Sequence, residues 1–109
     1  MTIGKNVGIY TNMSARLLFK RRIVVAEAAF VELIAWQLTQ PVQGCRHLFK
    51  YRLALVAGGR CVLRYDNEQG KGDHRHLGSE ECPYQFSTTE QLLADFKRDV
   101  ARWIDENPS

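Results

Sequence analysis

Hydrophobic residues recur along the chain with two spacings, which predict several strands followed by one helix. Residues 17–25 alternate roughly as in a half-buried strand. Residues 29–38 fit either a helix or a strand, and their Val, Ile, Phe and Trp content favours a strand. Two more β-rich runs, 48–56 and 60–65, flank a pair of glycines that suits a tight hairpin turn. We therefore expect an antiparallel sheet of about four strands.

The two glycines of this predicted hairpin, Gly58 and Gly59, also set an expected register. If they are the two turn residues, Ala57 pairs with Arg60, and every later pair can be counted from there. Counting along both strands gives two pairs near the end of the hairpin: Arg52 with Tyr65, and Lys50 with Asn67. A slip of one residue would reverse the face on which each side chain lies.

The C-terminal region carries a strong helix signal. Ser87, followed three residues later by Glu90, forms a capping-box pattern. Apolar residues then recur at helical spacing as far as Ile104, and Asn107-Pro108 is typical of a helix end. We expect this helix to lay its apolar stripe on the sheet. The fold class is therefore α+β, with a flexible leader over 1–14 and a single domain over 15–107.

Composition narrows the class of protein further. Apolar residues make up 45% of 109 positions, enough for one hydrophobic core, and no stretch of about 20 apolar residues exists to span a membrane. The chain also lacks the apolar core of a secretory signal, so we expect it in the cytoplasm. The three cysteines, Cys45, Cys61 and Cys82, form no Cys-x-x-Cys pair. They are interpreted as reduced thiols that act as small apolar residues.

Charge is distributed unevenly along the chain. Residues 1–64 hold ten Lys and Arg against two acids, a balance of +8, whereas 65–109 hold five against ten, a balance of −5. Such asymmetry suits a basic face for a polyanion and an acidic face for another partner. Folding could equally interleave the two halves and cancel the field, so charge alone leaves nucleic-acid contact open.

The candidate chemistry is concentrated in the polar segment 65–76. His74 and His76 would share one side of an extended backbone, with Arg75 on the other. Histidine titrates near neutral pH, so the pair could supply the general base and the general acid of one reaction. Lys71 lies between two glycines whose amides could help to bind a phosphate. Three more cations could lie nearby: Lys50, Arg52 and Arg64. This inventory suits metal-free cleavage of an RNA phosphodiester.

Two other interpretations of the same segment stay open. One is a metal site, although His-x-His alone is a weak signal and spacing does not fix a third ligand. Its candidate ligands would be His74, His76, Asp66, Glu68, Asp73 and Cys82. The other is a solvated loop with ordinary surface histidines. His47, which precedes a strand, is interpreted as structural or incidental.

Several segments together resemble a known family. Residues 51–56, 60–68, 70–76, 83–86 and 92–96 are similar to the TumE family of toxin–antitoxin proteins, and the string YDNE followed by GKGDHRH is the most specific part. The resemblance covers roughly residues 17–103. It implies the toxin component of a bacterial type II system, neutralised by a helix-turn-helix antitoxin. It also implies a ribonuclease that stops translation.

The residues and the resemblance together define one leading hypothesis. It is a cytoplasmic endoribonuclease that needs neither metal nor cofactor, with RNA and the antitoxin as partners and a homo-oligomer left open. The catalytic candidates are His74, His76, Lys71 and Arg75, the last two as phosphate ligands. The substrate-binding candidates are Lys50, Arg52, Arg64 and Tyr65. The supporting candidates are Asp66, Asn67, Glu68 and Asp73, which would orient the histidines or hold the glycine-rich turn. The alternative is a non-catalytic module that binds nucleic acid or protein through the same segment.

Overall fold

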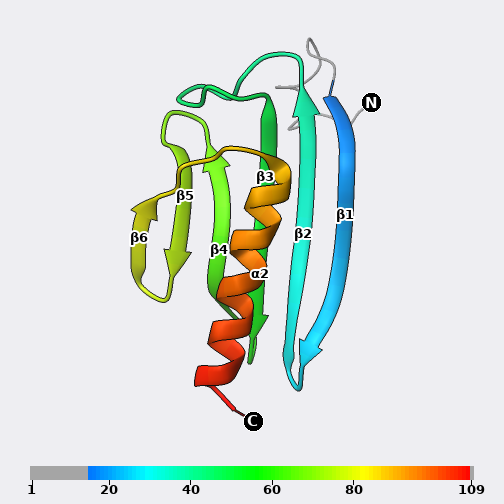
Figure 1. Ribbon diagram of the computed structural model, residues 1–109, viewed down its shortest axis with the longest axis vertical. Helices are drawn as coiled ribbons and strands as arrows, with labels where there is room; N and C mark the ends of the chain where they lie inside the picture. The colour runs from blue at the N-terminus through cyan, green and yellow to red at the C-terminus, as the bar shows by residue number, and fades with distance from the viewer. Residues whose placement is uncertain (1–14, 109) are drawn as a thin grey trace.

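The computed structural model describes residues 15–108, which form one antiparallel sheet and one helix (Figure 1). The predicted leader over 1–14 lies outside the described residues. The strands run in chain order across the sheet: β1 Ala15–Ala26, β2 Ala29–Leu38, β3 Phe49–Ala57, β4 Arg60–Glu68, β5 Gly72–Leu77 and β6 Glu80–Pro83. The helix, α2 Thr89–Glu106, follows them. The α+β class and the C-terminal helix are confirmed.

The sheet has six strands, so the expected number of four is too low. Of the two additional strands, β5 forms from the polar segment 65–76, interpreted as a site or loop, and β6 forms from the residues that follow it. Their sequences, GDHRHL and EECP, lack the apolar alternation by which strands are recognised. Backbone pairing with β4 holds β5 in place, and a turn at Gly78 (φ 61°) returns the chain as β6.

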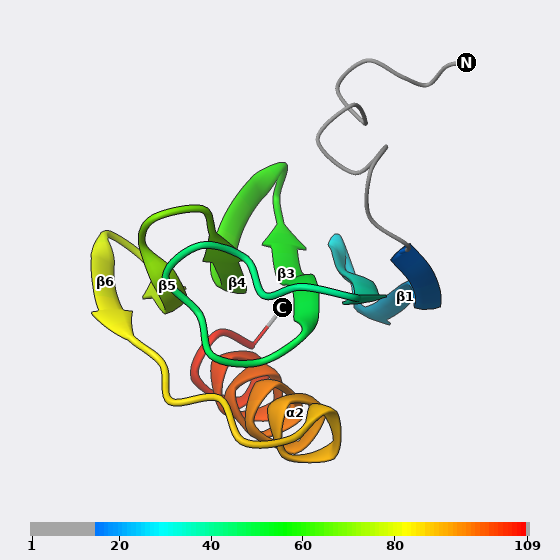
Figure 2. The same cartoon turned by 90° about the horizontal axis from the view of Figure 1, so that it is seen from above.

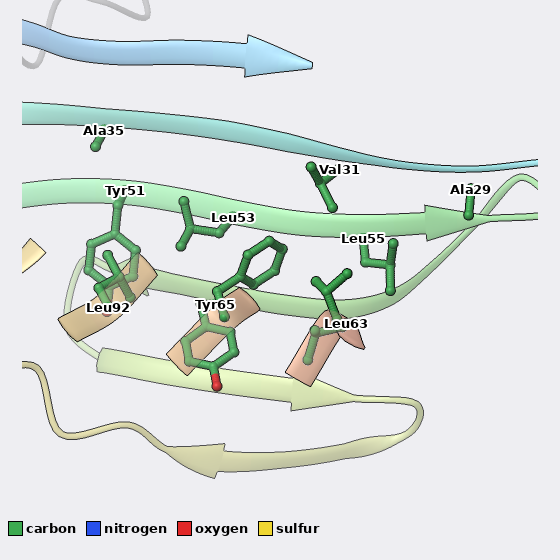
Figure 3. Close-up of a cluster of buried hydrophobic side chains, with 11 residues drawn as sticks. Ala29, Val31, Ala35, Tyr51, Leu53, Leu55, Leu63, Tyr65 and Leu92 are labelled. Carbon is green, nitrogen blue, oxygen red and sulfur yellow. The ribbon is translucent and has the colours of Figure 1, made fainter. Parts of the chain in front are cut away.

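A single side of the sheet carries the helix and the hydrophobic core. Seen from above, α2 lies against one side of the strands (Figure 2). The core side chains project toward it from alternate positions of β2, β3 and β4 (Figure 3). From α2, Leu92 and Phe96 enter this cluster and are 0% and 2% exposed. We call the side of the sheet turned away from α2 the open face, because none of the described elements packs on it.

The β3–β4 hairpin begins with the predicted pairing but departs from the predicted register. Ala57 does pair with Arg60, yet a β-bulge at Val62 shifts all later pairs by one, so the expected register is wrong beyond Val56. The physical reason is burial of the core side chains. Without the extra residue, Leu53 would pair with Arg64, and the arginine would enter the core. With it, Leu53 pairs with Tyr65, and Arg64 lies on the open face.

Two smaller expectations also need correction. The helix N-cap is Thr88, whose hydroxyl accepts from the Gln91 amide at 3.0 Å, and not Ser87 of the capping-box pattern. All three cysteines are free thiols, but Cys61 and Cys82 are exposed and therefore do not act as core residues. Within residues 15–108, no helix is both long and apolar enough to cross a membrane.

Candidate active site on the open face of the sheet

The two histidines of the predicted site lie side by side on the open face. They belong to β5, where side chains alternate between the two faces. Their ring centroids are 6.3 Å apart, and both rings approach the same carboxylate, Glu81 of β6. Arg75 points the other way, toward Asp99 of α2. The expected division of β5 into a histidine face and an arginine face is confirmed.

His76 is held by an arginine from the neighbouring strand. The Nη2 atom of Arg64 lies 3.0 Å from Nε2 of His76. A guanidinium can only donate a hydrogen bond, so Nε2 accepts and the ring proton lies on Nδ1. Arg64 in turn lies beside Asp66, with 3.1 Å between Nε and Oδ2, and Asp66 is 6% exposed. The imidazole is thus presented with an unprotonated nitrogen inside a cluster of opposite charges.

His74 has a different environment. Neither of its ring nitrogens has a hydrogen-bond partner among the described residues, and both are shielded from solvent. The nearest carboxylate oxygen, Oε2 of Glu81, is 3.5 Å from Nδ1. Buried polar atoms are normally paired, so an unpaired imidazole beside an open face is an unusual feature. A polar group that binds there would satisfy it.

Lys71 and Glu68 lie at the edge of this cluster, near the turn between β4 and β5. The Lys71 ammonium is 3.5 Å from a Glu68 oxygen and 3.7 Å from a Glu81 oxygen, and its side chain is 56% exposed. Arg52 of β3 is exposed and lies directly opposite Asp66. Lys71 therefore lies at the edge of the histidine cluster, and Arg52 lies two strands away from His74, on the far side of Asp66.

The remaining predicted site residues lie elsewhere. Tyr65 is 1% exposed in the core, and its hydroxyl donates to Asp99 at 2.5 Å. Burial, reinforced by this hydrogen bond, raises the pKa of Tyr65 above its ordinary value. Arg75 reaches the same carboxylate at 3.1 Å, and the neighbouring Tyr65 hydroxyl and this carboxylate raise the pKa of Arg75. Lys50 donates to the backbone oxygen of Asn67. Together, Tyr65 and Arg75 fasten β4 and β5 to α2.

Asn67 and Asp73 hold the ends of strands together. Asn67 is fully buried; its side chain accepts from the Tyr51 amide at 3.0 Å and donates to the Phe49 carbonyl at 2.6 Å. Asp73 accepts from the Tyr51 hydroxyl at 2.6 Å and from Nε2 of His47 at 2.8 Å. Burial alone would raise the pKa of Asp73, but the bonds from His47 and Tyr51 outweigh it and hold the pKa below its ordinary value.

Cys45, His47 and Asp73 are the single group of three potential metal ligands among residues 15–108. The hydrogen bonds indicate a structural role instead. The Phe49 amide donates to Nδ1 of His47 at 3.1 Å, so the proton of the neutral ring lies on Nε2, where it donates to Asp73. A histidine that binds metal through Nε2 needs that nitrogen bare and normally donates from Nδ1. His47 has the reverse arrangement, and its ring stacks on Phe86 at 3.9 Å between centroids.

The sequence-based ligand candidates are not gathered around one point. Asp73 lies on the opposite side of β5 from the two histidines, and the described part of the chain brings no group of three ligand atoms together on the open face. The residue that sequence reasoning missed is Glu81. No motif marks it, because its place beside both histidines depends on pairing between β5 and the unpredicted β6.

These features define a class: a small α+β protein with a single antiparallel sheet, one helix on one face and a histidine–arginine cluster on the other. A family model described as Toxin TumE matches residues 11–104. The chain therefore belongs to the TumE toxin family, and the resemblance seen in the sequence is confirmed. Membership implies a toxin role and a cognate antitoxin as partner. Comparison with curated proteins and with solved structures gives no significant match.

Proposed function

We propose that this toxin is a metal-independent endoribonuclease that inhibits translation by cleaving RNA on the open face of its sheet. One observation carries the proposal: His74 and His76 lie 6.3 Å apart on that face, among cations that could bind a phosphate. Two imidazoles at this separation could act on one bound phosphodiester once the ring of His74, whose nitrogens are shielded in the unbound protein, turns toward it. Their chemistry suits transphosphorylation, in which one group removes a proton and another supplies one.

In the proposed reaction, His76 is the general base. Arg64, which now donates to Nε2 of His76, turns to the bound phosphate and leaves that nitrogen free. His76 then takes the proton of the 2′-hydroxyl, and the 2′-oxygen attacks the phosphorus. The bond from phosphorus to the 5′-oxygen breaks, and protonated His74 gives its proton to the leaving oxygen. The products are a 2′,3′-cyclic phosphate and a 5′-hydroxyl.

Positive side chains would stabilise the charge of the crowded phosphate. Arg64 and Lys71 lie near the histidines, and Arg52 lies one strand beyond Arg64, so cationic donors are available around the place where negative charge develops. Glu81, within 3.6 Å of a nitrogen of each histidine, adds a carboxylate that could hold the two imidazoles in position. This supply of charge is the reason for proposing that no metal is required.

The test is RNA cleavage by the purified chain, freed of antitoxin, with and without EDTA. General acid and base groups typically contribute about 10²–10⁴-fold, so His74→Ala and His76→Ala should each lower kcat by about that factor. Circular dichroism should show both variants folded. Arg60→Ala, at the exposed β3–β4 turn, is the matched control and should cleave normally. Loss of activity in EDTA, or full activity of both histidine variants, would contradict the proposal.

A second candidate function has one observation in its favour. Both ring nitrogens of His74 are shielded from solvent in the unbound protein. This shielding favours a non-catalytic module that binds nucleic acid or protein through the exposed cations of the open face. The variants His74→Gln and His76→Gln separate the two functions. Glutamine keeps a hydrogen-bonding side chain but cannot transfer a proton near neutral pH, so a binding module would tolerate it and a ribonuclease would not.

We also propose that the cognate antitoxin carries a helix-turn-helix domain. The family resemblance and the opposite charge balance of the two halves of the chain support this partner. Co-expression with the adjacent gene should yield a complex that survives gel filtration. A stable complex with an antitoxin of another fold would contradict the assignment.

A further inference from the structure

The open face extends well beyond the histidines, across the whole sheet. Cross-strand pairing aligns one row of side chains from β1 to β5: Lys20, Ile34, Arg52, Asp66 and His74. A second, adjacent row runs beside it: Arg22, Glu32, Ala54, Arg64 and His76. Paired residues share a face, so both rows lie on the side turned away from α2. The proposed active site is therefore one end of a continuous surface.

The other end of this surface is a positively charged hollow of about 460 Å³ over β1, β2 and β3. Ile34 contributes to its lining between Lys20 and Arg52. Neither of these two cations makes an ion pair within residues 15–108, whereas Arg22 shares its charge with Glu32 at 3.9 Å. The hollow thus has uncompensated positive charge around an apolar side chain.

Flat π-surfaces accompany these charges. The Arg22 guanidinium lies over the Phe30 ring, 4.0 Å from its centroid. Trp36, two residues beyond Ile34, shares this face and pairs with Lys50. Nucleic-acid bases stack on aromatic rings and on guanidinium planes, and phosphates bind the cations between them. Apolar side chains gather instead on the helix side, in a groove between α2 and β1–β2, which suits a protein segment better.

We infer that the hollow is a subsite for single-stranded RNA, holding the nucleotides that flank the phosphodiester placed at the histidines. This inference rests on the proposed function and adds its substrate class. Four strand spacings separate β1 from β5, about 19 Å at ~4.8 Å each. A stacked strand advances about 3.4 Å per nucleotide, so about six nucleotides cover this distance. Unpaired bases are needed because only they can stack on side chains.

The experiment measures binding separately from cleavage. Fluorescence anisotropy with 2′-O-methyl RNA, which lacks the attacking hydroxyl, reports affinity for a single-stranded 2-mer, a single-stranded 8-mer and an 8-base-pair duplex. The 8-mer should bind at least about tenfold more tightly than the 2-mer and the duplex, with a salt slope of about −0.7 for each phosphate contact. The variant Lys20→Ala/Arg22→Ala should weaken 8-mer binding about tenfold and reduce the slope. The control Arg60→Ala should change neither.

Kinetics provide the second readout. The same double variant should raise KM for a cleavable 8-mer and leave kcat unchanged, while cleavage of a dinucleotide should stay as in the wild type. The subsite would be overturned if the 2-mer or the duplex bound as tightly as the 8-mer. It would also be overturned if the double variant lost affinity for the antitoxin but kept its affinity for RNA. Tight, length-dependent binding without any cleavage would support the subsite and refute the ribonuclease. Cleavage with an affinity that does not depend on RNA length would support the ribonuclease and refute the subsite.

Discussion

Removal of the Asp73 carboxylate should loosen the start of β5, the strand that carries both histidines. Asp73 is 13% exposed and accepts hydrogen bonds from Tyr51 and His47 at 2.6 and 2.8 Å. Hydrogen bonds to charged groups contribute about 1.5–3 kcal/mol each, and they are not additive here because both end on one oxygen. We expect Asp73→Ala to lower the free energy of unfolding by about 3 kcal/mol. Tyr51→Phe, which removes one bond together with its donor, should lower it by about 1–2 kcal/mol.

The pH dependence of this stabilisation has a defined sign. The pKa of Asp73 lies below its ordinary value of 3.8 in the folded protein. The stabilisation is therefore fully present above about pH 4 and is lost as the pH falls through the lower folded pKa. The difference in unfolding free energy between the wild type and Asp73→Asn should thus shrink as the pH falls below about 4.

Urea unfolding followed by circular dichroism measures both effects. In thermal unfolding at pH 7, the same loss of unfolding free energy in Asp73→Ala corresponds to a decrease in Tm of more than about 10 °C for a domain of this size. Asp105→Ala, which removes an exposed carboxylate from α2, is the control and should stay within about 0.5 kcal/mol of the wild type. If Asp73→Ala behaved like this control, the carboxylate would not anchor β5, and the argument from its hydrogen bonds would fail.

Two further predictions concern the backbone and the helix contact. Gly59 and Gly72 share a φ of +78°, but a Cβ at Gly72 would lie 3.1 Å from the Gly44 carbonyl oxygen and one at Gly59 would meet nothing. Gly72→Ala should therefore be at least about 1 kcal/mol more destabilising than Gly59→Ala in urea unfolding, and equal losses would refute the contact. Asp99→Ala leaves the buried Tyr65 hydroxyl with only a long bond to the Asp95 carbonyl, at 3.4 Å, and should lower the unfolding free energy by about 2–3 kcal/mol. In the Tyr65→Phe background the same change should have a smaller effect, and strict additivity would contradict the bond.

The sequence predicts an element well where burial produces a periodic pattern of apolar residues. It predicts an element poorly where only backbone pairing with a neighbouring strand determines the structure. The helix and the four apolar strands follow from periodicity, and the faces of His74 and His76 follow from the alternation of an extended chain. The bulge at Val62 could not be predicted by counting from the turn. It forms because only the shifted register buries the apolar side chains of both β3 and β4. β6 and Glu81 were missed for a related reason: an exposed strand of four residues has no apolar face to reveal it.

The alternation along β5 explains how a polar segment can be positioned accurately. Asp73 bonds with Tyr51 and His47, and Arg75 bonds with Asp99, all on the helix side of the sheet. Each histidine follows one of these anchored residues directly, so its Cα lies about 3.3 Å along the strand from a fixed point. The helix-side contacts of Asp73 and Arg75 thus fix the backbone position of both histidines, and the imidazoles take no part in these contacts. Substitutions at the histidines should therefore change chemistry with little loss of stability, whereas substitutions at Asp73 or Asp99 should affect stability first and the site through it.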